Sequence, residues 1–460
     1  MQLTVGFDID LTLIDPRAAV VEVATRLAAE EGVDVDAGLW ASRLGPPLEH
    51  ELAHWVAPER VVPAAARYRE LMAEVGPARI TLLPGASDAV AAVRASGGRV
   101  VVVTAKSQPL AVAALADLGV EVDAVVGGCW AEGKAPALVE HGASVYVGDH
   151  PGDVRAAAAA GALCVGVATG GVPPEGADVR LGDLTAFPQW WAEHLLDTRL
   201  AALDAALREV DGLLVAFSGG ADSAFLLAAA VRALGPGRVV AATAVSPSLA
   251  ADELPVAQAF ADSLGVRHVT PATDELSREG YVANGADRCF HCKATLLDTL
   301  RPLAQELGLA AVATGTNADD AVAGFRPGIR AAAERAALTP LLDAGLTKAQ
   351  VREASRRWGL ATADKPALAC LASRIAYGLQ VTPSGLARVD RAERALRSHL
   401  RAAGVAVEHV RVRDLGEGRA RVELDDAALE HLGDTGLEVV RSEGFATATA
   451  GAFRSGSMND

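Results

Sequence analysis

Short apolar runs rich in Val and Ala alternate along most of this chain with Ala- and Leu-rich segments of helical period. The runs are LTVGFDI, GGRVVVVTA, ASVYVGD, GLLVAFSGG, RVVAATAV, RHVTPAT and AAVATGT. Apolar strands separated by helices are typical of parallel sheets that are covered by helices on both faces. The alternation therefore predicts an α/β protein built from doubly wound parallel sheets.

The runs form two series, which predicts two such domains in a chain of 460 residues. Each series begins with a strand that carries its own polar motif, and a Pro- and Gly-rich stretch at 170–183 separates them. We expect the first domain at 1–195, with a helical insertion at about 16–80, and the second at 196–380. A helical pattern and two alternating strand patterns follow, so 381–460 is expected to form a small α+β domain and tail.

The formal charge of −16 argues against broad binding to nucleic acids or anionic membranes, because clustered Lys and Arg hold phosphate groups. Five cysteines are too few for a disulfide framework, so we expect reduced thiols. The first residues, MQLTVGFDID, do not resemble a signal peptide, and no segment is typical of a membrane span. We expect a cytoplasmic homo-oligomer that acts on a small-molecule nucleotide and has no nucleic-acid or membrane partner.

A first group of polar residues begins directly after the first strand. FDIDLTLID places Asp8 and Asp10 at the carboxyl end of that strand, where open α/β sheets bind ligands. Further along the chain come, in order, Thr104, Lys134, Asp149 and Asp153. A carboxylate attacks a phosphate ester only when cationic charge offsets the repulsion, so carboxylates together with Lys134 are a combination that phosphoryl transfer requires.

In order and spacing these residues resemble the four motifs of the haloacid dehalogenase-like phosphohydrolases, over residues 1–180. The resemblance implies that Asp8 is the nucleophile that forms an aspartyl-phosphate and that Asp10 is the general acid and base. It also implies a cap at about 16–80, phosphoryl-binding roles for Thr104 and Lys134, and a Mg²⁺ site on Asp8, Asp149 and Asp153. Leu11 stands where this family usually has glycine, and we expect it to affect the packing of the loop.

A second motif, LLVAFSGGADSAFLL, predicts a strand, a glycine loop and a helix. The turn holds Ser218, Gly219, Gly220, Asp222 and Ser223. Glycines let the backbone approach an anion, and the N-terminus of the helix offers free N–H groups to it. No GK[S/T] follows, so this is not a Walker A loop. It resembles the SGGxDS loop of the ATP-pyrophosphatases, which implies that it binds ATP with Mg²⁺ during an adenylation reaction.

Longer motifs in the rest of the chain indicate which family of ATP-pyrophosphatases this part resembles. They are RCFHCK (288–293), TGTNADD (314–320), FRPGIRAAAE (325–334), TPLLDAGLTKAQVR (339–352), DKPALACLASRIAYG (364–378) and RVR (411–413). Together they closely resemble the LarE family, over about residues 196–450. These ATP-dependent sulfur transferases thiolate a pyridinium dicarboxylate mononucleotide, pyridinium-3,5-biscarboxylic acid mononucleotide, in the biosynthesis of the nickel-pincer cofactor.

The LarE resemblance assigns further residues. It implies that Asp319 belongs to the ATP site and that Cys370 handles the sulfur. Arg411 and Arg413 alternate along a predicted strand and so face the same way, which suits binding of the substrate's phosphate.

Cys289 and Cys292 form a CxxC pair whose spacing is ambiguous by itself. A disulfide, a zinc site, a redox pair, an iron–sulfur cluster and coincidence all stay open, although a structural zinc ion wants four protein ligands. The LarE resemblance adds Cys370 to the pair. Some relatives have only that cysteine and give up its sulfur, whereas those with the additional pair resemble iron–sulfur enzymes. The resemblance therefore implies a [4Fe–4S] cluster on Cys289, Cys292 and Cys370.

Other functions also remain open. A tRNA-thiolating or amidating enzyme would use the same loop, but tRNA needs a basic surface, and residues 381–460 hold 11 Arg and no Lys against 13 Asp and Glu. A regulatory protein that senses nucleotides is a third possibility, against which the intact Asp8, Asp10 and Cys370 argue. We predict a bifunctional enzyme, an ATP-dependent sulfur transferase joined to a phosphohydrolase.

Overall fold

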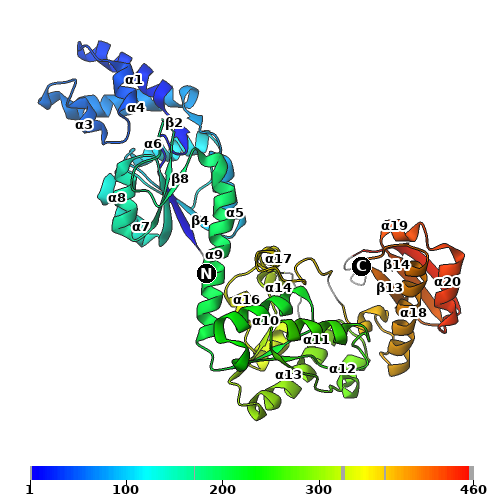
Figure 1. The fold of residues 1–460 in the computed structure, drawn as a ribbon. Helices are drawn as coiled ribbons and strands as arrows, with labels where there is room; N and C mark the ends of the chain where they lie inside the picture. Colours follow the sequence, from blue (N-terminus) through cyan, green and yellow to red (C-terminus); the bar gives the residue numbers. More distant parts are fainter. Residues whose placement is uncertain (1–2, 170, 323–326, 367–368, 455–460) are drawn as a thin grey trace. The chain divides into compact units, whose positions relative to one another are not determined.

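The computed structural model describes residues 3–169, 171–322, 327–366 and 369–454. It divides into two compact units, Met1–Leu195 and Leu196–Asp460, and Figure 1 follows the chain through both. Within the described ranges, no helix combines the length and the apolar character that a membrane crossing needs.

The first unit contains a six-stranded parallel sheet with the order β5-β4-β1-β6-β7-β8. Its strands are β1 (Thr4–Phe7), β4 (Arg99–Val103), β5 (Ala124–Val126), β6 (Ala143–Gly148), β7 (Leu163–Val167) and β8 (Val179–Leu181). Because β1 has β4 on one side and β6 on the other, the connections diverge at its carboxyl end and leave a crevice there.

Alternate residues of these strands point into two separate cores, one on each face of the sheet. Val100 and Val102 of β4 belong to one core, and Val101 and Val103 belong to the other. The helices that cover the two faces are α5 (Ala86–Ala95), α6 (Gln108–Asp117), α7 (Ala135–Glu140) and α8 (Pro151–Ala160), with η2 (Ala131–Lys134) and η3 (Leu184–Ala186). The predicted doubly wound sheet is confirmed for this unit.

A helical cap is inserted after β1. It consists of α1 (Arg17–Glu31), α2 (Ala37–Ser42), α3 (Leu48–Leu52), η1 (Pro58–Arg60) and α4 (Val61–Arg79). The chain enters and leaves the cap through β2 (Ile14–Asp15) and β3 (Thr81–Leu82), which pair antiparallel. Leu27 of α1 and Met72 of α4 are buried in the same apolar cluster as the sheet, so one continuous core holds the cap to it.

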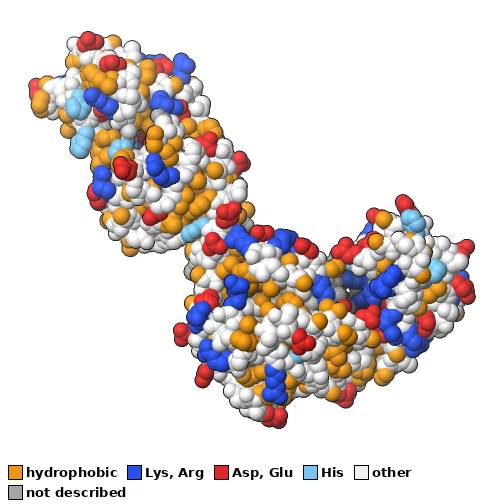
Figure 2. Space-filling model, in the orientation of Figure 1, with side chains coloured by type: hydrophobic (Ala, Val, Ile, Leu, Met, Phe, Trp, Pro, Cys, Tyr) orange, Lys and Arg blue, Asp and Glu red, His pale blue; other side chains and the backbone are white. Residues whose placement is uncertain are grey.

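Exposed ion pairs also join the cap helices. Arg60 pairs with Glu31 at 2.7 Å, and Arg67 pairs with Glu30 at 2.8 Å. Such exposed pairs each contribute about 0–1 kcal/mol, so the apolar core contributes most of the stability of the cap. On the face shown in Figure 2, acidic and basic side chains are interspersed over this unit.

The second unit contains a four-stranded parallel sheet with the order β11-β10-β9-β12. Its strands are β9 (Leu213–Ala216), β10 (Val239–Ala242), β11 (Arg267–Val269) and β12 (Ala311–Thr314). β9 is flanked by β10 and β12, so a second switch point lies at its carboxyl end. Leu213 and Leu214 point into different cores, which again means that helices cover both faces.

The helices of this α/β part lie between and after these strands. They are α9 (Phe187–Arg208), which begins in the first unit, α10 (Ala221–Leu234), η4 (Pro236–Arg238), α11 (Glu253–Ser263), η5 (Glu275–Ser277), α12 (Glu279–Val282), α13 (Arg288–Glu306), α14 (Ala318–Val322), α15 (Pro327–Glu334), α16 (Pro340–Asp343), α17 (Lys348–Arg357) and η6 (Leu371–Arg374).

A small α+β part ends the described chain. It contains α18 (Pro383–Ala402), β13 (Val410–Asp414), β14 (Arg419–Leu424), α19 (Asp426–Leu429), α20 (Gly433–Ser442) and β15 (Thr447–Ala452). The predicted strands β13 and β14 pair antiparallel, and β15 adds a parallel strand that the sequence did not indicate. The composition TATAGA gives β15 no alternation of apolar and polar residues, so its state depends on pairing with β14.

Candidate functional site

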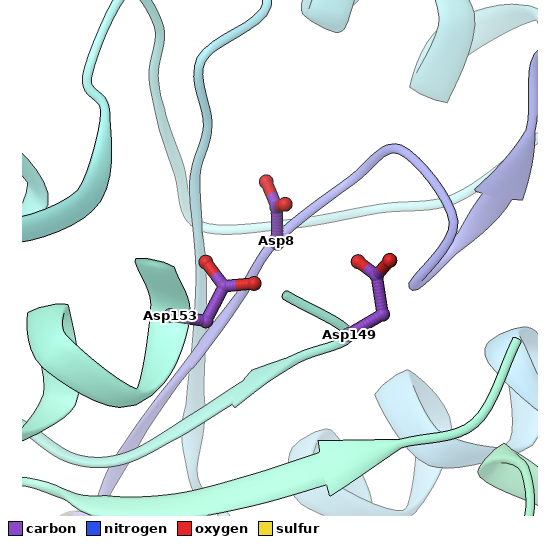
Figure 3. Close-up of side chains that lie close together, drawn as sticks. All are labelled: Asp8, Asp149 and Asp153. Carbon is purple, nitrogen blue, oxygen red and sulfur yellow. The ribbon is translucent and has the colours of Figure 1, made fainter. Parts of the chain in front are cut away.

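Three carboxylates meet at the carboxyl end of the central strand of the first unit (Figure 3). Asp8 follows β1, Asp149 follows β6, and Asp153 lies in the first turn of α8. One oxygen from each lies within 4.8 Å of the others, and in the described part of the chain no other group of three acidic, His or Cys residues is this close. Because β1 and β6 pair in parallel, their carboxyl ends meet at one edge of the sheet.

Lys134 lies beneath this triad and is almost fully buried. Its Nζ is 3.2 Å from Oδ1 of Asp8 and 2.6 Å from Oδ1 of Asp153, and it donates to the hydroxyl of Tyr146 at 2.8 Å. Burial, the largest influence, lowers the pKa of Lys134, but the charges of Asp8 and Asp153 outweigh it and leave the pKa above its ordinary value. Lys134 therefore carries the positive charge that this group of carboxylates needs.

The single positive charge of Lys134 does not neutralise the negative charges of three carboxylates. Burial, and after it the charge of Asp8, raises the pKa of Asp149 to about 8 and that of Asp153 to about 6. Oδ1 of Asp8 is buried and forms the ion pair with Lys134, but it accepts no well-directed hydrogen bond. Mg²⁺ prefers carboxylate oxygens, and a divalent cation here would replace the repulsion by attraction. The three residues therefore fit the Mg²⁺ ion that the sequence resemblance implies.

Asp10 lies beside the triad and is held by a lysine that the sequence motifs did not single out. Nζ of Lys106 donates to both carboxylate oxygens of Asp10, at 2.8 and 3.0 Å. Lys106 lies two residues after Thr104, whose Oγ1 accepts from the backbone N–H of Lys106 at 3.2 Å. The segment TAKS (104–107) was the signal for this contact in the sequence. It directly follows β4, so it had to lie at the same edge of the sheet as Asp10.

Leu11, which stands in the usual glycine position, adopts a left-handed backbone with φ of 57°. This conformation costs a bulky residue about 1–2 kcal/mol, whereas glycine adopts it readily. The turn places Oγ1 of Thr12 3.1 Å from Oδ1 of Asp149. The loop therefore still brings Thr12 to Asp149, although Leu11 stands in place of glycine.

A cavity of about 100 Å³ lies over Asp8 and Asp10, between the sheet and the cap. Thr104, Lys106 and Ser107 line it from the sheet side. Trp40, Arg43, Glu49, Glu51, Tyr68 and Arg69 line it from the cap. Trp40 and Tyr68 stack at 5.4 Å, and Arg69 pairs with Glu49 at 2.5 Å. The cap residues therefore form the part of the cavity that a leaving group would contact.

In the second unit, the glycine loop lies between β9 and the N-terminus of α10. Oγ of Ser218 is 3.1 Å from Oγ of Ser223, which also lies 3.1 Å from the carbonyl oxygen of Gly220. Gly219 has a left-handed backbone with φ of 72°. A Cβ on Gly315, after β12, would lie 2.8 Å from the backbone nitrogen of Ser223, so only glycine lets this strand end approach the loop.

Two charged groups flank the loop. Oδ1 of Asp222 is buried without a hydrogen bond, and burial raises the pKa of Asp222, although the charge of Lys348 opposes this. Nζ of Lys365 donates to the carbonyl oxygen of Gly219 at 3.0 Å and pairs with Glu253 at 3.2 Å. Lys365 belongs to the motif DKPALACLASRIAYG, but the sequence alone did not indicate a role for it. An exposed residue, Asp319, accepts from the backbone nitrogen of Lys348 at 2.8 Å.

The three predicted sulfur-handling cysteines are neighbours in the second unit. Cys289 and Cys370 are exposed, and Cys292 packs against the core of the C-terminal part. Burial raises the pKa of Cys292 to about 12, and the charge of Cys370 is the next cause. The three sulfur atoms do not all lie within 4.8 Å of one another. A tetrahedral zinc site, with Zn–S of about 2.3 Å, needs them about 3.8 Å apart, so the thiols as they lie here do not form such a site.

The two predicted phosphate-binding arginines differ in their surroundings. Arg413 is buried, and its Nε donates to Oε1 of Glu423 at 2.7 Å. Arg411 makes no hydrogen bond or ion pair with the described residues, and its guanidinium lies 4.5 Å from the ring centre of Phe453. Burial, and after it the charge of Arg374, lowers the pKa of Arg411. Arg411 is therefore the one of the two that can turn to an anion.

Residues 5–158 match the model of the haloacid dehalogenase-like hydrolase family. An uncharacterized protein of Synechocystis sp. is 39% identical over 273 residues, which are 58% of this chain and 98% of that protein. The pyridinium-3,5-bisthiocarboxylic acid mononucleotide synthase of Lactiplantibacillus plantarum is 34% identical over 270 residues, 58% of this chain and 95% of that enzyme. The chain belongs to the LarE family of such synthases. Its LarE-like portion is fused to an N-terminal haloacid dehalogenase-like domain, and the protein is an enzyme.

Two solved structures are also similar to this LarE-family chain. A putative β-phosphoglucomutase from Thermotoga maritima has a TM-score of 0.35 and 21% identity, and covers 42% of this chain and 99% of its own. A haloacid dehalogenase-like hydrolase from Streptococcus pneumoniae has a TM-score of 0.37 and 20% identity, and covers 41% of this chain and 98% of its own.

The raised pKa values of Asp149 and Asp153 predict a pH-dependent response to Mg²⁺. Without the ion, these carboxyls bind protons more tightly in the folded state, so their stabilising contribution is lost as pH rises from about 4 to about 8. Mg²⁺ competes with those protons and should raise the melting temperature of the first unit more at about pH 8 than at about pH 5. Thermal unfolding with EDTA and with MgCl₂ measures this difference.

Asp149→Asn is the control for this experiment, because it removes one carboxylate and keeps the shape of the side chain. We expect the variant to lose most of the Mg²⁺-dependent shift at about pH 8. An equal shift at both pH values in the unmodified protein would contradict the assignment of the metal site.

Proposed function

We propose that the second unit of this enzyme activates a substrate carboxylate with ATP and converts it into a thiocarboxylate. The observation that carries the proposal is the complete glycine loop, 218–223, which lies in the same unit as three neighbouring cysteines. The Lactiplantibacillus relative, a synthase of a bisthiocarboxylic acid mononucleotide, supports it. By analogy with that name, we propose pyridinium-3,5-biscarboxylic acid mononucleotide as the substrate.

The chemistry begins with adenylation, because a free carboxylate is a poor electrophile. A carboxylate oxygen attacks the α-phosphorus of ATP, the bond to the pyrophosphate breaks, and an acyl adenylate forms. The N–H groups at the start of α10 would bind the leaving pyrophosphate, and Lys365 lies near enough to the loop to neutralise its charge. Bound Mg²⁺ would neutralise phosphate charge, and the unpaired Oδ1 of Asp222 fits a ligand for it.

Sulfur transfer follows at the same carbonyl carbon. A sulfur nucleophile forms the C–S bond, and the C–O bond to AMP breaks, which gives the thiocarboxylate. The phosphate of the mononucleotide would bind to Arg411, the half-buried guanidinium without a hydrogen bond among the described residues. Arg413 is committed to Glu423, so we assign it the support of this strand.

For the source of sulfur, we propose a [4Fe–4S] cluster held by Cys289, Cys292 and Cys370. The support is that the charges of both Cys370 and Cys289 act on Cys292, so the three thiols that the LarE resemblance implies are neighbours, and three thiolates are typical ligands of such a cluster. Exogenous sulfide would supply one sulfur atom for each turnover at such a cluster, so the cysteines would be preserved.

For the first unit we propose Mg²⁺-dependent hydrolysis of a phosphate ester. Oδ1 of Asp8, which accepts no well-directed hydrogen bond, attacks the phosphorus, and the ester bond to the leaving oxygen breaks. Asp10 gives a proton to the leaving oxygen and later takes one from water, in the position in which Lys106 holds it. Bound Mg²⁺ and Lys134 would offset the charges of phosphate and carboxylates.

We further propose that the enzyme works in the cytoplasm as a homo-oligomer, on small molecules and without nucleic-acid or membrane partners. The five reduced thiols and the net charge of −16 support this setting. The size of the cavity under the cap suits a small leaving group.

Asp222→Ala tests the adenylation. The variant lacks the buried carboxylate of the loop, so substrate-dependent release of pyrophosphate from ATP should fall to background while aryl phosphatase activity stays unchanged. The control is Asp211→Ala, an exposed acid outside the loop, which should behave like the unmodified enzyme. Pyrophosphate release at the normal rate in Asp222→Ala would show that the loop has another role.

Asp8→Asn tests the phosphatase. The change keeps the shape of the side chain and removes its nucleophilic charge, so hydrolysis of p-nitrophenyl phosphate with Mg²⁺ should be abolished. Asp10→Asn should lower the rate by about 10²–10⁴-fold, as expected for loss of a general acid and base. Asp88→Asn, at an exposed site, serves as control. The proposal fails if the unmodified enzyme hydrolyses no member of a broad phosphate-ester panel.

Cys289→Ser and Cys292→Ser test the source of sulfur. Each variant should lose the brown colour after anaerobic reconstitution, and with it repeated sulfur transfer. Cys129→Ser, in the first unit, should keep both. Full transfer by the two variants, together with loss of one sulfur mass from Cys370, would establish a sacrificial route instead.

A further inference from the structure

Arg288 precedes Cys289 directly and is the first residue of α13, yet only 5% of it is exposed. Its Nη1 donates to the carbonyl oxygen of Ala372 at 2.9 Å and to Oδ1 of Asn284. Ala372 lies 84 residues further along the chain, in the turn that directly follows Cys370. One guanidinium therefore connects the helix of the CxxC pair with the loop of the third cysteine.

Asn284 fixes the direction of this guanidinium. It is fully buried and has a left-handed backbone with φ of 56°, which asparagine tolerates better than most residues. Its Nδ2 donates to the carbonyl oxygens of Ile375, Ala376 and Leu379, at 3.2, 2.8 and 3.0 Å. Because the amide nitrogen faces these carbonyls, the amide oxygen faces Arg288.

The neighbouring carbonyls of the same loop also accept from arginines. Arg374 donates to the carbonyl oxygens of Ala369 and Cys370, at 2.5 and 3.2 Å, and Arg413 donates to that of Ser373 at 3.1 Å. Arg374 belongs to the loop itself, and Arg413 belongs to β13. Among these described bonds, the one from Arg288 alone originates on α13, so it fixes the loop relative to Cys289 and Cys292.

We propose that Arg288 is a positioning residue that assembles the three-thiol site before any metal or substrate binds. Cys289 and Cys292 are held together by one helical turn, whereas Cys370 is far away in sequence and reaches them only if its loop stays on α13. A loop held in place presents its thiol at a high effective concentration, and a loose loop does not. This role rests on the proposed sulfur transfer, which is the reaction that the three-thiol site would serve. The geometry of the thiols can be tested by itself.

The side chain has to be arginine for a physical reason. A guanidinium donates in several fixed directions at once, and its charge strengthens both bonds. Both bonds come from Nη1, whose two hydrogens lie in the plane of the guanidinium and point in fixed directions. The ammonium of a lysine rotates freely on a flexible stem, so it does not fix Ala372 and Asn284 in these two directions. Glutamine keeps a donor and loses the charge and reach.

Dibromobimane, which bridges neighbouring thiols, measures this geometry in the full chain without any cofactor. Mass spectrometry then quantifies peptides in which Cys370 is joined to Cys289 or Cys292. We expect Arg288→Gln to lower the bridged fraction about tenfold, the lower end of the 10–100-fold effect of supporting residues around metal ligands. Arg288→Lys should give an intermediate value. Arg301→Gln, an exposed arginine on the same helix, should match the unmodified protein.

Equal bridging in Arg288→Gln and the unmodified protein would overturn the proposal. If Arg288→Gln does not fold, as judged by its melting curve, then Arg288→Lys decides, and bridging equal to that of the unmodified protein would again overturn it. Iron bound after anaerobic reconstitution is a separate measurement and should fall with the bridged fraction. If the unmodified protein binds no iron, the cluster proposal fails, while the bridging experiment still decides the role of Arg288.

Discussion

Parallel strand pairing is the constraint on which both centres of this protein depend. In each unit the first strand of the sheet lies between two neighbours whose connections diverge, and the carboxyl ends of all three meet at one edge. Residues far apart in sequence, such as Asp8 and Asp149, or Ser223 and Gly315, become neighbours there. Without this pairing neither the carboxylate triad nor the glycine loop would have its partners.

The carboxylate triad and the C-terminal part neutralise buried charges in two different ways. In the first unit Lys134 pairs with two carboxylates, and the remaining repulsion appears as raised pKa values of Asp149 and Asp153. A divalent cation bound at this position would replace that repulsion by attraction. In the C-terminal part, Arg374 and Arg413 are paired with buried glutamates and also donate to backbone carbonyls, so their charges hold a loop in place.

These two arrangements of buried charge suit different kinds of chemistry. The proposed phosphoryl transfer requires carboxylate oxygens that can bind a cation and attack phosphorus, and the incomplete neutralisation of Asp8 suits that role. The proposed sulfur site requires a third thiol near two others, and the hydrogen bond from Arg374 to the carbonyl oxygen of Cys370 helps to hold this loop while the thiol stays exposed. The fusion joins two kinds of chemistry on related α/β sheets.

The sequence by itself determined the fold class and the local motifs, because alternating strand and helix patterns and short loops such as SGGADS are properties of neighbouring residues. It also supplied the ordered motifs whose resemblance to the haloacid dehalogenase-like phosphohydrolases implied the carboxylate triad. It did not reveal that Lys106 holds Asp10, that β15 completes a sheet, or that Arg288 binds Ala372. Those features depend on which segments meet across long stretches of chain, and only the packing of the tertiary structure decides that.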